Sequence, residues 1–562
     1  MMAFAIIAGA KSVARPNGFV TRSMTKAGGR LSQMTLVASP DLPWLAGRNA
    51  LLVGRLFERG SDREISDGAA LDHAITDGEE ELLRNYWGSY VLVQESKAGQ
   101  LSILRDPSGA IPCYISGPSH DVVLSDATVG RILGLIDRPQ IDWAFLTQWL
   151  QFPYLRAART GLLNVEELTP GACRPLADAK SSETQVWQPA CLASPALIDA
   201  GAAARQLRQT ALNSAARVSG EGLTLIQMSG GLDSSILAAC LAAKGHDLKA
   251  ITFASASPDG DERHYASAVA EHLGIPLAIA HETDAPPSEP APPGFRPGIN
   301  ILLEAIDRMV EDYRRTIGAG IVVDGGGGDS LFGFSRTAAP ILDAFRDGEA
   351  WDTMQSVSER SSASMWRVAQ VTLRQFLRRP SGWPENRHFI GAAAILGPAE
   401  RHGWLAGSTR LPRGKLEHLT SLVHIQHFLD RHAIGGDHRH PLMNQPLIEL
   451  CLSIPSWVWN ADGCDRAVAR RAFRDSLPPA ITERRTKGSL QGYFHRRFRK
   501  MMPVMRPLLL DGELARRQLV DRAALEHALA DDDVLNDDRA LRLSEIATLE
   551  TWLSAWRSLG AS

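Results

Sequence analysis

The chain has 562 residues, of which 44% are hydrophobic and 22% charged, and its formal net charge is −3. A chain of this length exceeds one ordinary hydrophobic core, so we expect at least two domains. The near-neutral charge excludes a general affinity for nucleic acid or anionic membranes. No apolar run reaches the length of a membrane span, so membrane insertion is not expected. Six cysteines without C-x-x-C pairing argue against zinc or disulfide frameworks and favour a cytoplasmic protein.

The first part of the chain, to about residue 190, contains short alternating apolar runs separated by turn signals, a pattern typical of β structure. Residues 1–10 are apolar but lack a basic segment, so they predict a first strand rather than a signal peptide. A polar stretch, residues 178–184, predicts a boundary after this β-rich part.

From about residue 202, helical and strand patterns alternate. A helix is expected near 204–218, strands at 223–228 and 248–253, and a helix between them. This βαβ order predicts a parallel sheet, and ligands of such sheets bind at the carboxyl ends of the strands. Beyond about residue 340 the chain reads as mostly helical.

Residues 286–297 carry six prolines and no periodicity, which predicts a semi-rigid exposed loop. A plain linker and a lip over an active site both remain open for it.

A glycine-rich turn follows the predicted strand at 223–228. Its members are Ser229, Gly230, Gly231, Leu232, Asp233, Ser234 and Ser235. A strand, a glycine-rich turn and a helix present backbone N–H groups and a positive helix end to an anion. The Asp233 carboxylate would repel phosphate unless a cation lies between them. The motif therefore predicts pyrophosphate plus Mg²⁺, and an enzyme that splits ATP between its α and β phosphates. It is not a Walker A loop, because no Gly-Lys-Ser/Thr follows at the required spacing.

A second apolar strand ends in the run Gly325, Gly326, Gly327 and Gly328, followed by Asp329. Glycines let a backbone approach a ligand closely, so Gly327 and Gly328 are candidate nucleotide contacts. Asp329 is a candidate second Mg²⁺ carboxylate beside Asp233. The alternative is a flexible turn in which Asp329 caps the next helix.

The 229–235 motif resembles the PP-loop of ATP pyrophosphatases, a group that contains asparagine synthetases, β-lactam synthetase and lasso peptide cyclases. Residues 86–93 and 105–114 resemble the glutaminase domain of asparagine synthetases. The resemblance implies an α/β protein: an Ntn-hydrolase-like αββα domain over 1–190, and a PP-loop ATP pyrophosphatase domain with added helices over 202–562. It also implies an adenine site near Thr252 and Phe253.

In that family an N-terminal cysteine attacks glutamine, whereas this chain starts Met1, Met2, Ala3 and its nearest cysteine is Cys113. We therefore expect no glutamine hydrolysis and an amine from another source. The run at 325–333 resembles the family motif G-E-G-x-D-E-x-F-G, with Gly326 at the first Glu and Ser330 at the second. Gly326 is expected to leave room for a bulky substrate such as a folded peptide, and the G-G-G-G-D-S form is similar to lasso peptide cyclases.

Residues 437–444 resemble the family stretch E-x-R-x-P-F-L-D, with Asp437 on the Glu and Arg439 on the Arg, which makes both candidate catalytic residues. His427, His432, His438 and His440 lack a ligand spacing, so structural or polar-surface roles are expected for them. Lys487 lies in the family's closing pattern. Its ammonium is expected to stabilise negative charge during adenylation or aminolysis, the alternative being a solvated basic turn.

Together with these motifs, the resemblance to lasso peptide cyclases implies ATP-dependent macrolactam formation in a lasso peptide. An Asp or Glu side chain of a core peptide is adenylated and joined to the peptide's N-terminal amine, with AMP and pyrophosphate released. ATP and Mg²⁺ are the expected cofactors. The expected partners are the precursor or core peptide, a leader peptidase and a leader-recognition protein. The alternative is an amidoligase of asparagine synthetase or β-lactam synthetase type acting on a small molecule; a non-catalytic scaffold is disfavoured because the PP-loop, Asp329 and Lys487 are all present.

Overall fold

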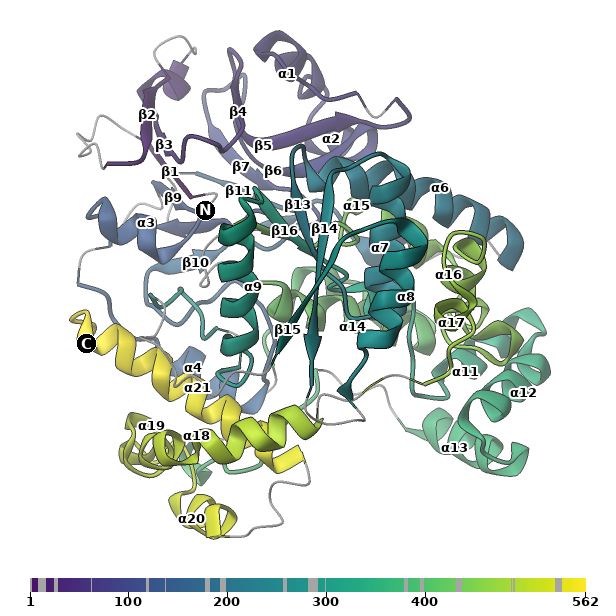
Figure 1. Cartoon of the computed structure of the whole chain (residues 1–562). Helices are drawn as coiled ribbons and strands as arrows, with labels where there is room; N and C mark the ends of the chain where they lie inside the picture. The colour runs from purple at the N-terminus through teal and green to yellow at the C-terminus, as the bar shows by residue number, and fades with distance from the viewer. Residues whose placement is uncertain are drawn as a thin grey trace.

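Three β-sheets form the framework of the computed structural model (Figure 1). The structure describes residues 3–8, 17–24, 29–61, 63–117, 121–136, 138–176, 182–192, 199–255, 260–281, 292–298, 300–378, 383–394, 399–430, 437–486, 488, 491–530 and 538–562. Two sheets are antiparallel and come from the N-terminal part of the chain, and the third is parallel and begins at residue 224.

The two antiparallel sheets have the strand orders β10-β8-β9-β1-β3-β2 and β12-β11-β7-β6-β5-β4. Their strands are β1 (Phe4–Ile7), β2 (Val20–Ser23), β3 (Thr35–Ala38), β4 (Trp44–Ala46), β5 (Ala50–Glu58), β6 (Tyr86–Glu95), β7 (Leu101–Arg105), β8 (Tyr114–Ser116), β9 (Val122–Leu124), β10 (Val165–Glu167), β11 (Ala172–Pro175) and β12 (Thr184–Gln185). Alternate residues point inward, so Ile6, Val53 and Val93 share one core between the sheets.

Helices cover the outer faces of both sheets. Their bounds are α1 (Gly68–Ala74), α2 (Glu79–Asn85), α3 (Ala127–Ile132), α4 (Trp143–Gln151) and α5 (Pro189–Leu192). Leu71 of α1 packs with Leu52 and Leu92 of the second sheet, while Phe145 of α4 packs with Ala5 of the first. The predicted αββα layering and the predicted first strand are therefore confirmed.

The parallel sheet has the order β15-β14-β13-β16-β17. Its strands are β13 (Thr224–Gln227), β14 (Leu248–Ala254), β15 (Leu277–His281), β16 (Ile321–Asp324) and β17 (His438–Arg439), and the helices around it are α6 (Ala200–Ser219), α7 (Leu232–Ala243), α8 (Arg263–Leu273) and α9 (Glu304–Ile317). Leu225 and Val322 face α9, whereas Ile226 and Val323 pack toward α7 and α8, on the opposite side of the sheet in Figure 1. Gln227 and Asp324 end neighbouring strands side by side.

The remainder of the chain is helical, as predicted. These helices are α10 (Gly328–Leu331), α11 (Ala339–Asp347), α12 (Ala350–Ser361), α13 (Met365–Leu377), α14 (Arg413–Leu429), α15 (Gln445–Ser453), α16 (Ala467–Ala472), α17 (Pro479–Thr482), α18 (Gln491–Asp511), α19 (Glu513–Arg516), α20 (Arg522–Ala530) and α21 (Asp538–Ser558). The last long helices share a core with the first N-terminal sheet, so the division into 1–190 and 202–562 stays a prediction. Among the described residues no helix is long and apolar enough to cross a membrane.

The described part of the proline-rich segment, residues 292–297, is not an exposed loop, so that expectation is wrong there; residues 286–291 lie outside the described ranges. Phe295 is 1% exposed and packs on Tyr114 with ring centroids 4.7 Å apart. The Phe295 carbonyl accepts a hydrogen bond from Gly161 N at 2.9 Å. The ring of Phe295 and the guanidinium of Arg296, which has a buried carboxylate partner, anchor this segment despite its prolines.

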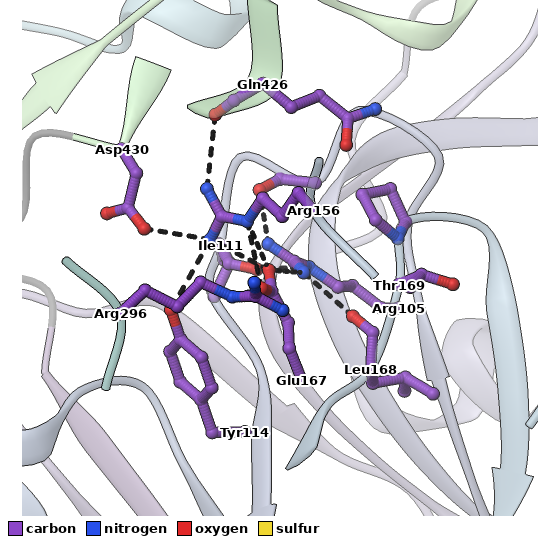
Figure 2. Close-up of polar contacts among 12 residues, drawn as sticks. Arg105, Ile111, Tyr114, Arg156, Glu167, Leu168, Thr169, Arg296, Gln426 and Asp430 are labelled. Atoms are coloured by element: carbon purple, nitrogen blue, oxygen red, sulfur yellow. Dashed lines mark hydrogen bonds and ion pairs between the residues drawn. The ribbon is translucent and has the colours of Figure 1, made fainter. Parts of the chain in front are cut away.

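That buried partner is Glu167, which is 1% exposed and accepts hydrogen bonds from Arg105, Arg156 and Arg296 at 2.9, 2.8 and 2.7 Å (Figure 2). Arg156 also donates to the carbonyl of Gln426 at 3.1 Å and pairs with Asp430 at 2.8 Å. The cluster therefore ties the N-terminal sheets to the end of α14, which borders the site described next.

Candidate active site

The turn at residues 229–231 depends on its glycines. Gly230 has φ +73°, and a Cβ there would lie 2.6 Å from Cβ of Tyr265. Gly231 is the N-cap of α7 and offers no side-chain cap, so the first N–H groups of the helix remain available to a ligand. Such a helix start is suited to an anion.

This turn and the second glycine run line one cavity of about 290 Å³. The lining residues include Ser229, Gly231, Leu232, Asp233, Ser234, Asp324, Gly325, Gly326, Gly327, Gly328, Asp329, Arg466, Arg470 and Arg484. The structure thus brings together most of the predicted nucleotide-binding residues, with Gly230 and the buried Ser235 directly behind them. Thr252 and Phe253 do not line the cavity: Thr252 is buried, and Phe253 packs on Tyr493. Their adenine role stays a prediction.

The glycine run packs tightly against its neighbours, so the expectation that it opens room for a bulky substrate is wrong. A Cβ on Gly325 would lie 2.5 Å from the backbone nitrogen of Ser234, and one on Gly328 would lie 2.5 Å from Cβ of Asp233. At Gly326 a Cβ would lie 2.7 Å from both Asp324 Oδ1 and His440 Nδ1. Side chains from elsewhere already fill the space that a residue at 326 would need.

Asp233 and Asp329 meet around the guanidinium of Arg466. Arg466 Nη1 lies 3.3 Å from Asp233 Oδ1 and also contacts Asp329. Arg466 is buried, has φ +50°, and lies over the ring of Phe334 at 5.3 Å. Mg²⁺ prefers carboxylate oxygens as ligands. Asp233 and Asp329 bring such oxygens together around one positive charge, so these two residues fit this metal. Residues 465–470 resemble the family's closing pattern, but only the tertiary structure places Arg466 between two carboxylates far away in the chain.

Arg484 supports the glycine turn from the other side. Its guanidinium stacks on the ring of Tyr265 at 3.6 Å and pairs with Glu262. Glu262 Oε1 also accepts a hydrogen bond from the backbone nitrogen of Gly488 at 2.8 Å. Lys487 itself lies outside the described residues, so its catalytic role stays a prediction.

Residues 437–440, around β17, all line a cavity between the two halves of the molecule, but their side chains have different partners. Asp437 pairs with Arg439, and Arg439 donates to the carbonyl of Val218 at 2.8 Å. The intervening His438 and His440 instead contact Asp324, at 3.0 and 2.6 Å. The catalytic roles of Asp437 and Arg439 stay predictions, and the two histidines join the edge of the site.

Asp324, His438 and His440 place three potential ligand atoms within 4.8 Å of one another. Burial alone would raise the pKa of Asp324, but His440 and His438 outweigh burial and hold this pKa well below its usual range. The carboxylate is therefore ionised. His427 is buried elsewhere, with its pKa lowered to about 3 by burial, and His432 lies outside the described residues.

The thiol of Cys113 is not a candidate nucleophile. It is fully buried, and burial raises its pKa to about 12. The cavity between the two halves is lined by apolar residues together with arginines, carboxylates and histidines, and none of the described residues around it is a cysteine.

Comparison with known proteins agrees with this geometry. The family model described as asparagine synthase matches residues 213–554. A comparison with curated proteins gives no match. The match covers more than half of the chain, including both glycine runs, Asp329 and Arg466. The chain therefore belongs to the asparagine synthase family and is an ATP-dependent amide ligase.

Proposed function

We propose that this chain closes a macrolactam within a peptide, as lasso peptide cyclases do. It would activate an Asp or Glu side chain of a core peptide with ATP and join it to the peptide's N-terminal amine. The observation that carries this proposal is a second cavity next to Asp329, one of the two candidate metal ligands. It encloses about 850 Å³ and is bordered by Ser330, Gly333 and Phe334.

The two cavities adjoin at α10 and α14. Asp329 lines the first and Ser330 the second, and Ile425 and His424 divide in the same way on α14. A folded peptide in the second cavity would therefore present a carboxyl group to ATP in the first. A free amino acid would leave most of a space this large to water, so the cavity favours a peptide.

In the activation step, the 229–235 turn and the start of α7 would bind the pyrophosphate, which the backbone N–H groups favour electrostatically. Asp233 and Asp329 would hold Mg²⁺, which neutralises charge on the leaving pyrophosphate. The peptide carboxylate attacks the α-phosphorus, and pyrophosphate departs to leave an acyl adenylate. The amine then attacks the acyl carbon and AMP departs. Holding both groups of one peptide together supplies a high effective concentration.

A neighbouring surface supports a peptide or protein partner. On α13, Trp366, Leu373 and Leu377 recur at i, i+7 and i+11 on one helix face, and all three are strongly exposed. Val371 of the same helix lines the second cavity. We place the docking of the precursor, or of the peptidase that frees its amine, on this face.

The test is incubation with Mg-ATP and a panel of candidate core peptides, each with a free N-terminal amine and an internal Asp or Glu. Mass spectrometry should show ATP-dependent loss of one water and release of AMP. Activity with free aspartate and ammonia, and with none of the peptides, would replace this proposal by the small-molecule amidoligase of the same family.

A further inference from the structure

The wall between the nucleotide cavity and the cavity between the two halves is formed by Asp324, His438 and His440. Asp324 lines the nucleotide cavity, and both histidines line the other one. Asp324 is 8% exposed. Neither activation of the carboxylate nor binding of pyrophosphate uses this cluster.

Both ring nitrogens of His440 face hydrogen-bond acceptors. Nδ1 lies 2.6 Å from Asp324 Oδ1, and Nε2 lies 2.9 Å from the carbonyl oxygen of Leu429. Both partners are acceptors, and only the doubly protonated imidazolium donates from both nitrogens. If His440 donates both bonds, it is an imidazolium that pairs with the buried Asp324, and the end of α14 holds the far side of the ring.

Asp324 still has one acceptor position to offer. A carboxylate has about four lone-pair positions on its two oxygens. Oδ1 uses two of them, for Gly326 N at 2.7 Å and for His440. Oδ2 accepts from His438 at 3.0 Å, which leaves one position on Oδ2 without a partner among the described residues. Asp324 lines the cavity in which the acyl adenylate would form.

The Asp324 carboxylate also lies close to where a side chain on residue 326 would begin. A side chain on residue 326 would begin 2.7 Å from Asp324 Oδ1, so the Asp324 carboxylate occupies the place where such a side chain would start. Because residue 326 has no side chain, the Asp324 carboxylate has the space that it needs.

We infer that Asp324 is the catalytic residue that binds the amine nucleophile and accepts its proton, and that His440 is the positioning residue that fixes its carboxylate. This inference rests on the proposed function. The amine nitrogen bonds to the acyl carbon, the bond from that carbon to the AMP oxygen breaks, and AMP leaves with the electron pair. The amine proton passes to Asp324 and from there to solvent. Because the two histidines hold the pKa of Asp324 below its usual range, Asp324 relays this proton to solvent and does not retain it.

A metal ion at this cluster fits less well. Metal–ligand distances of about 2.0–2.1 Å place neighbouring ligand atoms roughly 3 Å or more apart. Asp324 Oδ1 and His440 Nδ1 are 2.6 Å apart, which fits a shared proton.

The experiment measures carboxylate activation and amide formation separately in Asp324→Asn. His246→Gln, on the loop after α7, is the control. ATP–pyrophosphate exchange should stay within about threefold of the wild type, while amide formation falls about 10²-fold or more. Hydroxylamine, which is largely unprotonated at neutral pH, needs no base, so its capture of the acyl adenylate as a hydroxamate should be retained. His440→Gln should show the same split between amide and hydroxamate, to a smaller degree.

Three results would overturn the inference: amide formation within threefold of the wild type, joint loss of exchange and hydroxamate in a folded variant, or a stoichiometric divalent metal that the variants lose. If no peptide of the panel supports exchange in the wild type, the proposed function fails instead. The same split is then measured with aspartate and ammonia.

A further measurement covers the case in which Asp324→Asn does not fold. In the wild-type protein with ¹⁵N-labelled histidine rings, the imidazole of His440 should carry a proton on both nitrogens. A singly protonated ring at neutral pH would overturn the assignment.

Discussion

Two buried carboxylates, Glu167 and Asp324, differ in their hydrogen-bond partners. The difference distinguishes a carboxylate that only joins segments of the chain from one that can contact a substrate. Both oxygens of Glu167 are fully used by three guanidinium groups, as Figure 2 shows. Asp324 has two imidazoles and one backbone N–H, and keeps one acceptor position beside a cavity. A buried charge whose partners fill every position can only hold segments together, whereas one with a position left over can bind a substrate.

Asp233 and Asp329 form a third arrangement, in which the guanidinium of Arg466 lies where a metal ion would bind. The largest effect is therefore expected for Asp233→Ala, which should abolish ATP–pyrophosphate exchange, a loss of roughly 10³-fold or more, because the proposed Mg²⁺ would lose one of its two carboxylate ligands. Radiolabelled pyrophosphate exchange measures this directly. Retained exchange in a folded protein would refute the metal assignment.

Glu167→Gln should chiefly affect stability, because it leaves three buried arginines without their shared anion. We expect the free energy of unfolding in urea to fall by about 3–5 kcal/mol at neutral pH. The three arginines outweigh burial and hold the pKa of Glu167 below its usual range. Its contribution is therefore complete above the unfolded pKa of about 4.3 and is lost as the pH falls below it.

The matching measurement is the difference in unfolding free energy between wild type and Glu167→Gln across pH. This difference should be constant from about pH 5 to 7 and shrink toward acid. A difference that grows toward acid would contradict the assignment of Glu167 as an ionised carboxylate that joins segments of the chain.

Gly326→Ala tests whether Asp324 and His440 really fill the space at 326. The added Cβ must displace one of them, so we expect a stability loss of about 1–3 kcal/mol and slower amide formation with exchange largely kept. Gly320→Ala is the control, since a Cβ there meets nothing within 4 Å. Equal behaviour of the two variants would show that the space at 326 is open.

Arg466→Ala should make the apo protein responsive to Mg²⁺ alone. Without the guanidinium, the metal no longer competes for Asp233 and Asp329, so Mg²⁺ should raise the Tm of the variant by about 2–4 °C. The wild type should respond less. Differential scanning calorimetry with and without Mg²⁺ checks this, and an equal response of both proteins would contradict the competition.

The smallest effect is expected on the exposed face of α13. Trp366→Ser with Leu373→Ser should raise KM for the peptide about three- to tenfold and leave kcat unchanged, because only a docking contact is lost. Leu541→Ser, an exposed apolar residue on α21, is the control. An unchanged KM would remove the α13 face from the docking model.

Much of the fold could be predicted from the sequence because the evidence is local. The strand–turn–helix at 223–243 follows from an apolar run, a glycine turn and a helical pattern, and the βαβ order then requires a parallel sheet. The candidate ligands Asp233 and Asp329 could be found in the same way, because each follows a strand that ends at the same edge of that sheet. The short alternating runs predicted β structure in the N-terminal part, and the resemblance of its motifs implied the αββα layering.

The tertiary structure alone decided which side chains share a site. Arg466 is 233 residues from Asp233, and no local pattern connects them. His440 had no ligand spacing, yet the register of β17 against β16 places it against Asp324. The sequence predicted that Gly326 leaves room for a substrate, whereas in the structure Asp324 and His440 occupy the space beside it. Local chemistry is set by the order of residues along the chain, whereas the pairing of charges depends on strand register and helix packing over hundreds of residues.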